Sequence, residues 1–164
     1  RQPRDVQARG MTSANYKLRD PATLMHEIAD AVDLTEDTAY VALVHHPSTR
    51  QRLLSVERLA IPALLDDDDD ISEDLCEIAC SFGIGWRQRT FEHLLTTVVV
   101  RPGRCVFGPN ESVWLSGWRY ANHCESMFTG DLILVTEHGW DDFMSGETGY
   151  HPRMLQRPVL IGSS

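Results

Sequence analysis

Four cysteines and seven histidines are the side chains best suited to metal or thiol chemistry in this chain. Cys76 and Cys80 lie four residues apart, so on a helix they would share one face. Together with His123, Cys124 or His138 they could complete a zinc site, although the second pair lacks the usual Cys-x2–4-Cys spacing. A free cysteine also packs well as a small apolar side chain. We expect the latter here, with no bound metal and no cofactor.

A thiol nucleophile would need a base within hydrogen-bond reach. Cys80 with His93, or Cys124 with His138, could form such a pair in three dimensions. The chain has no glycine-rich phosphate loop, because 83–85 (Gly-Ile-Gly) lacks a third glycine and a preceding strand. An enzyme that uses Cys/His or Arg/carboxylate groups therefore stays an alternative.

A second histidine motif, His45-His46-Pro47-Ser48, has the composition of a metal motif without its spacing. Adjacent side chains on a strand point to opposite faces, so the two histidines would not hold one ion. We expect a turn at these residues.

The longest run of one charge is acidic. Its members are Asp66, Asp67, Asp68, Asp69 and Asp70. The run lacks the alternating ligands and the glycine of a calcium loop. The segment 21–85 around it has three basic and fourteen acidic residues, which makes nucleic-acid binding unfavourable. A solvated loop is the simplest interpretation, and docking of a basic partner is the functional one.

Hydrophobic periodicity and turn residues predict alternating helices and strands. The expected helices are 20–32, 70–83, 87–95 and 111–122, and the expected strands are 40–44, 52–61, 97–100 and 131–135, followed by a last short strand. Asp20-Pro21 and Asp70 with Glu73 are the expected helix starts. This order is typical of an α/β fold with a mixed β-sheet flanked by helices.

The 164 residues fit one domain. We expect a polar N-terminal tail at 1–19, a single α/β domain at 20–145 and an irregular C-terminal segment at 146–164. No apolar run is long enough for a membrane span, the N-terminus has no apolar core of a secretory signal, and the cysteines are scattered. These features favour a cytoplasmic protein with reduced thiols and no membrane association.

The order of elements from about residue 39 to 143 resembles the JAB/MPN domain, and specifically its bacterial RadC-type version. In that family a strand, a polar turn and a return strand, as at 41–59, precede a helix and a strand, as at 72–100. That strand ends in the metal motif His-x-His-Pro, followed by a downstream Ser-x-x-Asp; a further helix and strand then follow. The resemblance implies a three-layer, deaminase-like arrangement and a metallopeptidase-like fold.

The metal motif of that family is altered in this chain. Val99 and Arg101 occupy the two histidine positions, Pro102 keeps the turn, and the carboxylate position falls near Glu111 or Ser112. Valine cannot ligate zinc and arginine repels it, whereas a catalytic zinc needs three protein ligands. The resemblance therefore implies a metal-free, non-peptidase member.

Other side chains near the altered motif could bind a ligand or a partner. Arg101 and Arg104 flank the turn and could hold an anion or a carboxylate. Trp114 is expected to face the core, but it would be an interface anchor if it were exposed. The glutamate that activates water in catalytic relatives has two candidates, Glu36 and Glu57.

We expect a non-catalytic, JAB/MPN-like pseudoenzyme that binds another protein or a second copy of itself. One alternative is a hydrolase or other enzyme that uses the groups above in the same cleft. The other is a regulatory module for a small anionic ligand.

Overall fold

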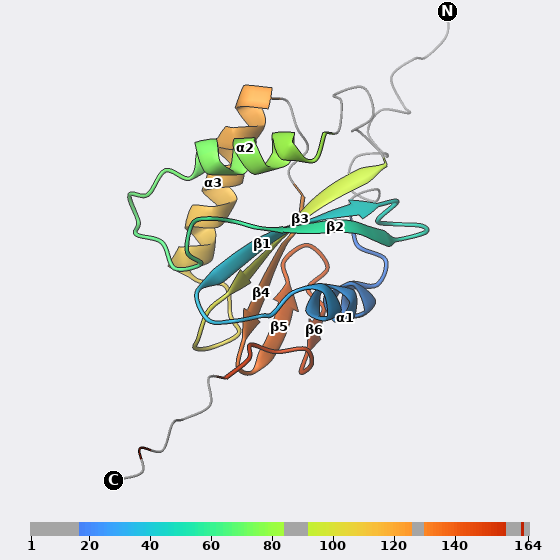
Figure 1. The fold of residues 1–164 in the computed structure, drawn as a ribbon, viewed down its shortest axis with the longest axis vertical. Helices are drawn as coiled ribbons and strands as arrows, with labels where there is room; N and C mark the ends of the chain where they lie inside the picture. The colour runs from blue at the N-terminus through green and yellow to red at the C-terminus, as the bar shows by residue number, and fades with distance from the viewer. Residues whose placement is uncertain (1–16, 84–91, 126–129, 157–161, 163–164) are drawn as a thin grey trace, which may run out of the picture.

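The computed structural model describes residues 17–83, 92–125, 130–156 and 162; at 122–125 only the backbone is described. The helices are α1 (Pro21–Ala31), α2 (Ser72–Ser81) and α3 (Pro109–Glu125), and the strands are β1 (Thr38–His45), β2 (Arg52–Arg58), β3 (His93–Val100), β4 (Leu132–Thr136), β5 (Gly139–Asp142) and β6 (Thr148–Gly149). These elements follow one another in the predicted order (Figure 1). No helix among the described residues has the length and apolar content that a membrane span requires.

The strands form one six-stranded sheet in the order β2-β1-β3-β4-β5-β6. Among the described residues, β3 and β4 pair in parallel, and the other four strand pairs are antiparallel. Parallel neighbours need a crossover connection, which α3 supplies between β3 and β4. The predicted α/β class with a mixed sheet is thus confirmed.

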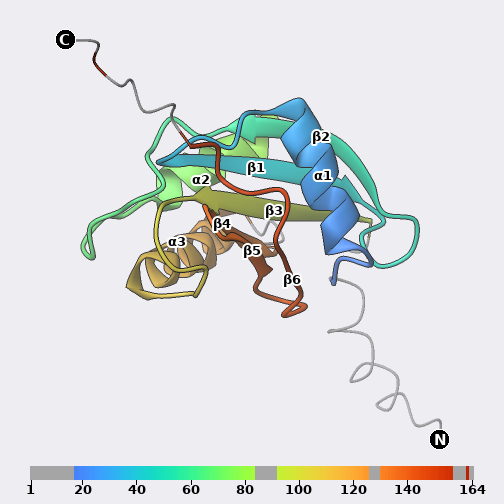
Figure 2. The ribbon, with the colours of Figure 1, turned by 90° about the horizontal axis from the view of Figure 1, so that it is seen from below.

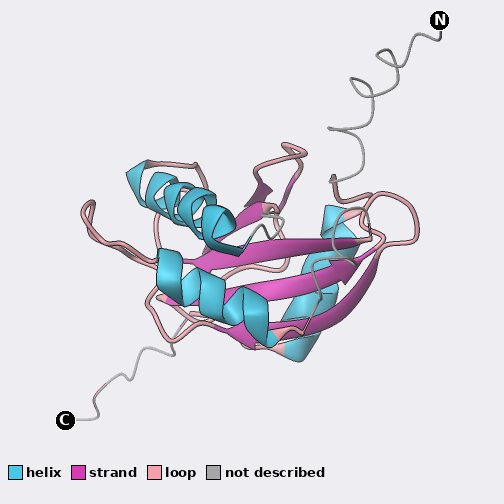
Figure 3. Cartoon of the chain, turned by 90° about the horizontal axis from the view of Figure 1, so that it is seen from above, coloured by secondary structure: helices cyan, strands magenta, loops and turns pink. Residues whose placement is uncertain are grey.

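The sheet has a hydrophobic core on each face. Alternate residues of β1 contribute to the two cores, with Tyr40, Ala42 and Val44 in one and Ala39, Val41 and Leu43 in the other. Helix α1 belongs to the first core, and α2 and α3 belong to the second (Figures 2 and 3). Because both faces are covered, β1 and β3 are buried along almost their whole length.

One of the two predicted helix starts is confirmed. The Asp20 side chain accepts a hydrogen bond from the Thr23 N–H at 3.0 Å, and Pro21 is the first residue of α1. The predicted capping box at Asp70 and Glu73 was wrong. Asp70 instead accepts from the backbone and hydroxyl of Ser72, so its carboxylate closes a local turn before α2.

The structure differs from two further expectations. Residues 93–95, expected at the end of a helix, begin β3, and 84–91 lie outside the described residues. The folded part also exceeds 20–145, since Leu18 is 4% exposed and Met154 is 7% exposed within the α1 core. The C-terminal segment is not irregular throughout, because β6 adds to the sheet edge and Leu155 bridges to Thr35.

Candidate functional site

Arg101 and Glu111 form a buried ion pair between the end of β3 and the start of α3. The Arg101 N–H donates to the Val135 carbonyl at 3.1 Å, which extends the β3–β4 pairing by one residue. Its Nε donates to Glu111 Oε2 at 3.1 Å, and its Nη2 donates to Glu111 Oε1. The Arg101 and Glu111 side chains are 12% and 1% exposed, so the pair is largely withdrawn from water.

The rest of the Arg101 guanidinium is bonded to the turn that follows it. Its other donors reach the carbonyls of Pro102, Arg104 and Val106 at 3.1, 3.3 and 2.9 Å. A guanidinium has five N–H groups, and all five are used here. Arg101 therefore has no N–H left for an anionic ligand.

Glu111 is held on its other side by the start of α3. Its Oε1 accepts from the Gly108 N–H at 3.2 Å, the reciprocal contact of a helix N-terminus. A carboxylate in the first turn also interacts favourably with the helix dipole. The bonded Glu111 carboxylate raises the pKa of Arg101, while burial acts in the opposite direction. The positive charge of Arg101 is thus maintained.

The other residues of the altered motif differ in burial. Val99 is fully buried in the core under α2 and α3. Trp114 is also fully buried, and its Nε1 donates to the Ala63 carbonyl at 2.9 Å. Pro102, Arg104 and Ser112 are exposed. The structure therefore brings together the Arg101 and Glu111 side chains, with the Pro102 and Arg104 carbonyls bonded to the guanidinium, and Trp114 is a core residue.

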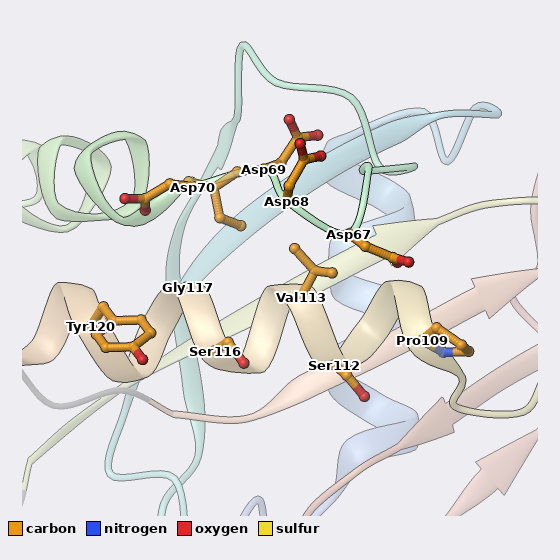
Figure 4. Close-up of a pocket in the computed structure, with 11 residues that line it drawn as sticks. Asp67, Asp68, Asp69, Asp70, Pro109, Ser112, Val113, Ser116, Gly117 and Tyr120 are labelled. Carbon is orange, nitrogen blue, oxygen red and sulfur yellow. The ribbon is translucent and has the colours of Figure 1, made fainter.

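The acidic run lies across a groove from α3. The groove has a volume of about 860 Å³. Its lining comprises Asp67, Asp68, Asp69, Asp70, Ile71, Pro109, Ser112, Val113, Ser116, Gly117 and Tyr120; we call it the α3 groove. Figure 4 shows the aspartates above the helix, from Asp70 near Gly117 to Asp67 near Val113. The predicted acidic loop thus forms one wall of a concave surface.

The carboxylates of this wall differ in their bonding. Asp69 accepts from the Asp66 N–H at 2.8 Å, and Asp70 is bonded to Ser72. Asp67 and Asp68 have neither a hydrogen bond nor an ion pair with any other described residue. Two negative charges at the groove therefore remain uncompensated by the part of the chain that the structure describes.

The floor of the α3 groove is formed by small and apolar side chains of α3. Ser112 and Ser116 are exposed, Val113 is half-buried, and the Tyr120 residue at one end is 64% exposed. Gly117 lets the helix approach the loop, since a Cβ there would lie 2.5 Å from Ile71 Cγ1. The floor thus combines apolar surface with hydroxyl groups.

A thiol that the sequence reasoning did not single out lies beside a histidine. Cys105 and His138 line a small cavity of about 290 Å³ with Trp140, Gly149 and Tyr150. The Cys105 Sγ is 3.8 Å from the Leu134 carbonyl oxygen, and burial raises the pKa of this thiol. A catalytic thiol needs a lowered pKa, so the environment of Cys105 does not activate it.

The predicted pairs involving Cys76 and Cys80 gain no support. The side chains of His123 and Cys124 lie outside the described residues. Among the residues that the structure describes, no three His, Cys, Asp or Glu side chains are placed to hold a metal ion. Cys76 is half-buried against the α2–α3 core, and Cys80 is exposed.

The histidine motif forms a turn, but its rings come together. His46 leaves the strand with a φ of 46°, and its ring centroid lies 3.9 Å from that of His45. The prediction that these side chains diverge was wrong, because it assumed extended backbone at both residues. The His93 ring stacks on His45 at 4.8 Å, and burial together with these neighbours lowers the pKa of His45.

Two buried aspartates form a second polar group that the sequence reasoning missed. Asp131 is 2% exposed and Asp142 is fully buried. Asp131 Oδ1 accepts from the N–H groups of Leu132 and Met144 at 2.8 and 3.0 Å. Burial, first, and the neighbouring Asp142 carboxyl raise the pKa of Asp131 to about 9. Aspartate is uncommon in strands, so the buried Asp142 at the end of β5 was an available signal.

Comparisons with known proteins give no relative: no family model, no curated protein and no solved structure matches the chain.

Proposed function

We propose that the chain is a JAB/MPN-like domain of the RadC type that has lost its metal site and acts by binding another protein. A helix, a hairpin, a second helix and a strand precede the crossover helix α3, and β4 and β5 follow it. This order, with a single parallel pair at β3 and β4, supports the assignment. In the RadC-type family that the chain resembles, the metal ligands lie at the end of the strand before the crossover helix.

The Arg101–Glu111 pair is the observation that carries this proposal. It lies where β3 ends and α3 begins, and its guanidinium is bonded to one carboxylate and three carbonyls. The guanidinium occupies this place and already pairs with the Glu111 carboxylate, so neither side chain is free to ligate a divalent cation. The pair therefore supplies from the protein itself the positive charge that a metal would bring, but offers no open coordination position for water.

Metal analysis tests this part of the proposal. The purified protein, incubated with zinc and then dialysed, is expected to retain far less than one zinc per chain by elemental analysis. A quenched peptide substrate is expected to remain uncleaved with or without zinc. One tightly bound zinc per chain, whose removal by a chelator abolishes peptide hydrolysis, would refute the proposal.

A thiol-dependent enzyme is the second candidate, because Cys105 and His138 share one small cavity. The raised pKa of Cys105 predicts a slow reaction with iodoacetamide at pH 7.5, since only the thiolate attacks. The exposed Cys80 is the internal control, and peptide mass spectrometry separates the two sites. We expect Cys80 to be alkylated at least about tenfold faster. Faster alkylation of Cys105, abolished by His138→Ala, would favour the enzyme instead.

A further inference from the structure

We propose that the α3 groove binds a cationic segment of a partner protein, one in which arginine or lysine lies beside an apolar side chain. This inference rests on the proposed protein-binding function and names the site and the chemistry of its partner. The partner must match three properties of the groove: its charge, its apolar floor and its shape.

The charge of the groove wall selects a positively charged partner. Asp67, Asp68, Asp69 and Asp70 lie along one side of the α3 groove. The sequence from 66 to 77 contains eight acidic residues and no basic residue. No lysine or arginine among the described residues forms an ion pair with this segment. A concave surface lined by one sign of charge concentrates the opposite charge and accelerates its association.

The floor of the groove favours a partner that also has an apolar side chain. Val113 is half-buried, and Tyr120 is 64% exposed at the end of the groove. Aromatic side chains of this kind commonly anchor protein interfaces. Ser112 and Ser116 of the same helix are small enough for a bound backbone to approach it. A partner segment with an apolar side chain between its cationic residues would match both the acidic wall and the apolar floor of the groove.

Other ligand classes fit the groove less well. A nucleic acid would bring its phosphates against the aspartates, which is unfavourable. For a metal ion the wall offers poor ligands, because the carboxylates of Asp69 and Asp70 already bond to the loop. The volume of about 860 Å³ is that of a site for several side chains and not for a single ion.

Selection of displayed peptides tests the proposal with the full chain. Random nine-residue peptides are selected on the wild-type protein, and the enriched peptides are then measured by fluorescence polarisation. We expect enrichment of arginine or lysine next to leucine, isoleucine or an aromatic residue. Micromolar dissociation constants are expected to weaken about tenfold from 50 to 250 mM salt, since exposed charges are screened.

Matched variants locate the binding in the groove. Asp67→Asn with Asp68→Asn is expected to weaken the selected peptides at least about tenfold, because it removes two uncompensated wall charges. Ser116→Trp is expected to abolish binding by filling the floor without changing the charge. The control, Glu73→Gln with Asp74→Asn, removes two exposed acidic charges of α2 outside the groove lining and is expected to change the dissociation constant less than about twofold.

Several results would overturn the inference. One is enrichment of acidic or uncharged peptides, or no enrichment at all. Equal weakening by the groove and control charge pairs, or full binding by Ser116→Trp, would also do so. Concentration-dependent dimerisation that Ser116→Trp abolishes would make a second copy the occupant. In all these cases a zinc-free protein without peptidase activity would leave the metal-free part of the proposed function intact, whereas a required zinc would refute that part.

Discussion

At the scale of the residue, Asp131 occupies an environment far from that of water. Asp131 is 2% exposed, and the neighbouring Asp142 is fully buried. Two carboxylates in contact cannot both keep their charge at low cost, so one holds a proton. The pKa of Asp131, about 9 against 3.8 for an ordinary aspartate, assigns that proton to Asp131.

This proton predicts a pH dependence of stability. Between pH 3.8 and about 9 the folded state holds a proton that the unfolded state has lost. The contribution of Asp131 to the free energy of unfolding therefore falls as pH rises, by up to about 1.4 kcal/mol per unit. Asp131→Asn should remove this slope, since an amide can donate to Asp142 and accept from the two N–H groups. Urea unfolding from pH 5 to 9 measures the difference.

The exposed Asp67→Asn is the control for this experiment and should keep the wild-type slope. If Asp131→Asn were strongly destabilised at pH 8 and kept that slope, the shared proton would be assigned to the wrong residue.

Glu111 gives a second prediction at this scale. Glu111→Gln should lower the free energy of unfolding by about 3 kcal/mol, because it leaves the Arg101 charge buried without its counterion. The control is Glu73→Gln on the exposed side of α2, which should change it by less than about 0.5 kcal/mol. Chemical denaturation measures both. A change of less than about 1 kcal/mol for Glu111→Gln would show that the pair is not structural.

At the scale of the element, the contact between α2 and α3 depends on one glycine. A Cβ at Gly117 would lie 2.5 and 2.9 Å from Ile71 Cγ1 and Cδ1, and 3.1 Å from Leu75 Cδ1. Alanine favours a helix over glycine by about 1 kcal/mol, but a buried clash commonly costs about 1–3 kcal/mol. The clash should therefore outweigh the helix propensity at this position.

Gly117→Ala is accordingly expected to lower the melting temperature, although alanine is the better helix former. Adding Ile71→Val should raise the melting temperature part of the way back, because it removes the Cδ1 methyl group from the contact. Ser116→Ala, on the exposed side of the same turn, is the control and should have little effect. A higher melting temperature for Gly117→Ala would mean that the helices have room to separate.

At the scale of the whole molecule, the C-terminal segment closes the fold. After β5 the chain adds β6 to the sheet edge, and the Trp140 Nε1 donates to the His151 carbonyl at 2.9 Å. The Met154 N–H then donates to the Thr136 carbonyl, and the Leu155 N–H to that of Leu34. This segment thus connects the β4 and β5 region with the loop that follows α1.

Adjacent residues of this segment give a matched pair of variants. Met154 is 7% exposed in the α1 core, whereas Leu155 is 51% exposed. Met154→Ala should lower the free energy of unfolding by about 2–3 kcal/mol, and Leu155→Ala by less than about 0.5 kcal/mol. Both substitutions keep the backbone hydrogen bonds. Equal effects in urea unfolding would show that the segment does not pack as described.

The sequence by itself determined the order of elements, the α/β class, the Asp20 helix start and the burial of Trp114, because these follow from local periodicity and capping. On the basis of a resemblance, it also placed Arg101 and either Glu111 or Ser112 in one altered motif. Local patterns do not contain the distances between segments remote in the sequence. Only the tertiary structure decided that the Arg101 guanidinium is fully bonded and that Asp67 to Asp70 face α3 across a groove.

The dependence on contacts between remote segments also explains the sites that the sequence missed or misjudged. Asp131 holds a proton because the fold buries it near Asp142, and Cys105 and His138 line one cavity because two loops converge. The His45 and His46 rings meet because His46 adopts a positive φ, which an assumed strand excludes. Charge, polarity and helix periodicity are properties of the chain, whereas pKa values, cavities and pairings arise from contacts that form only when the sheet and its helices assemble.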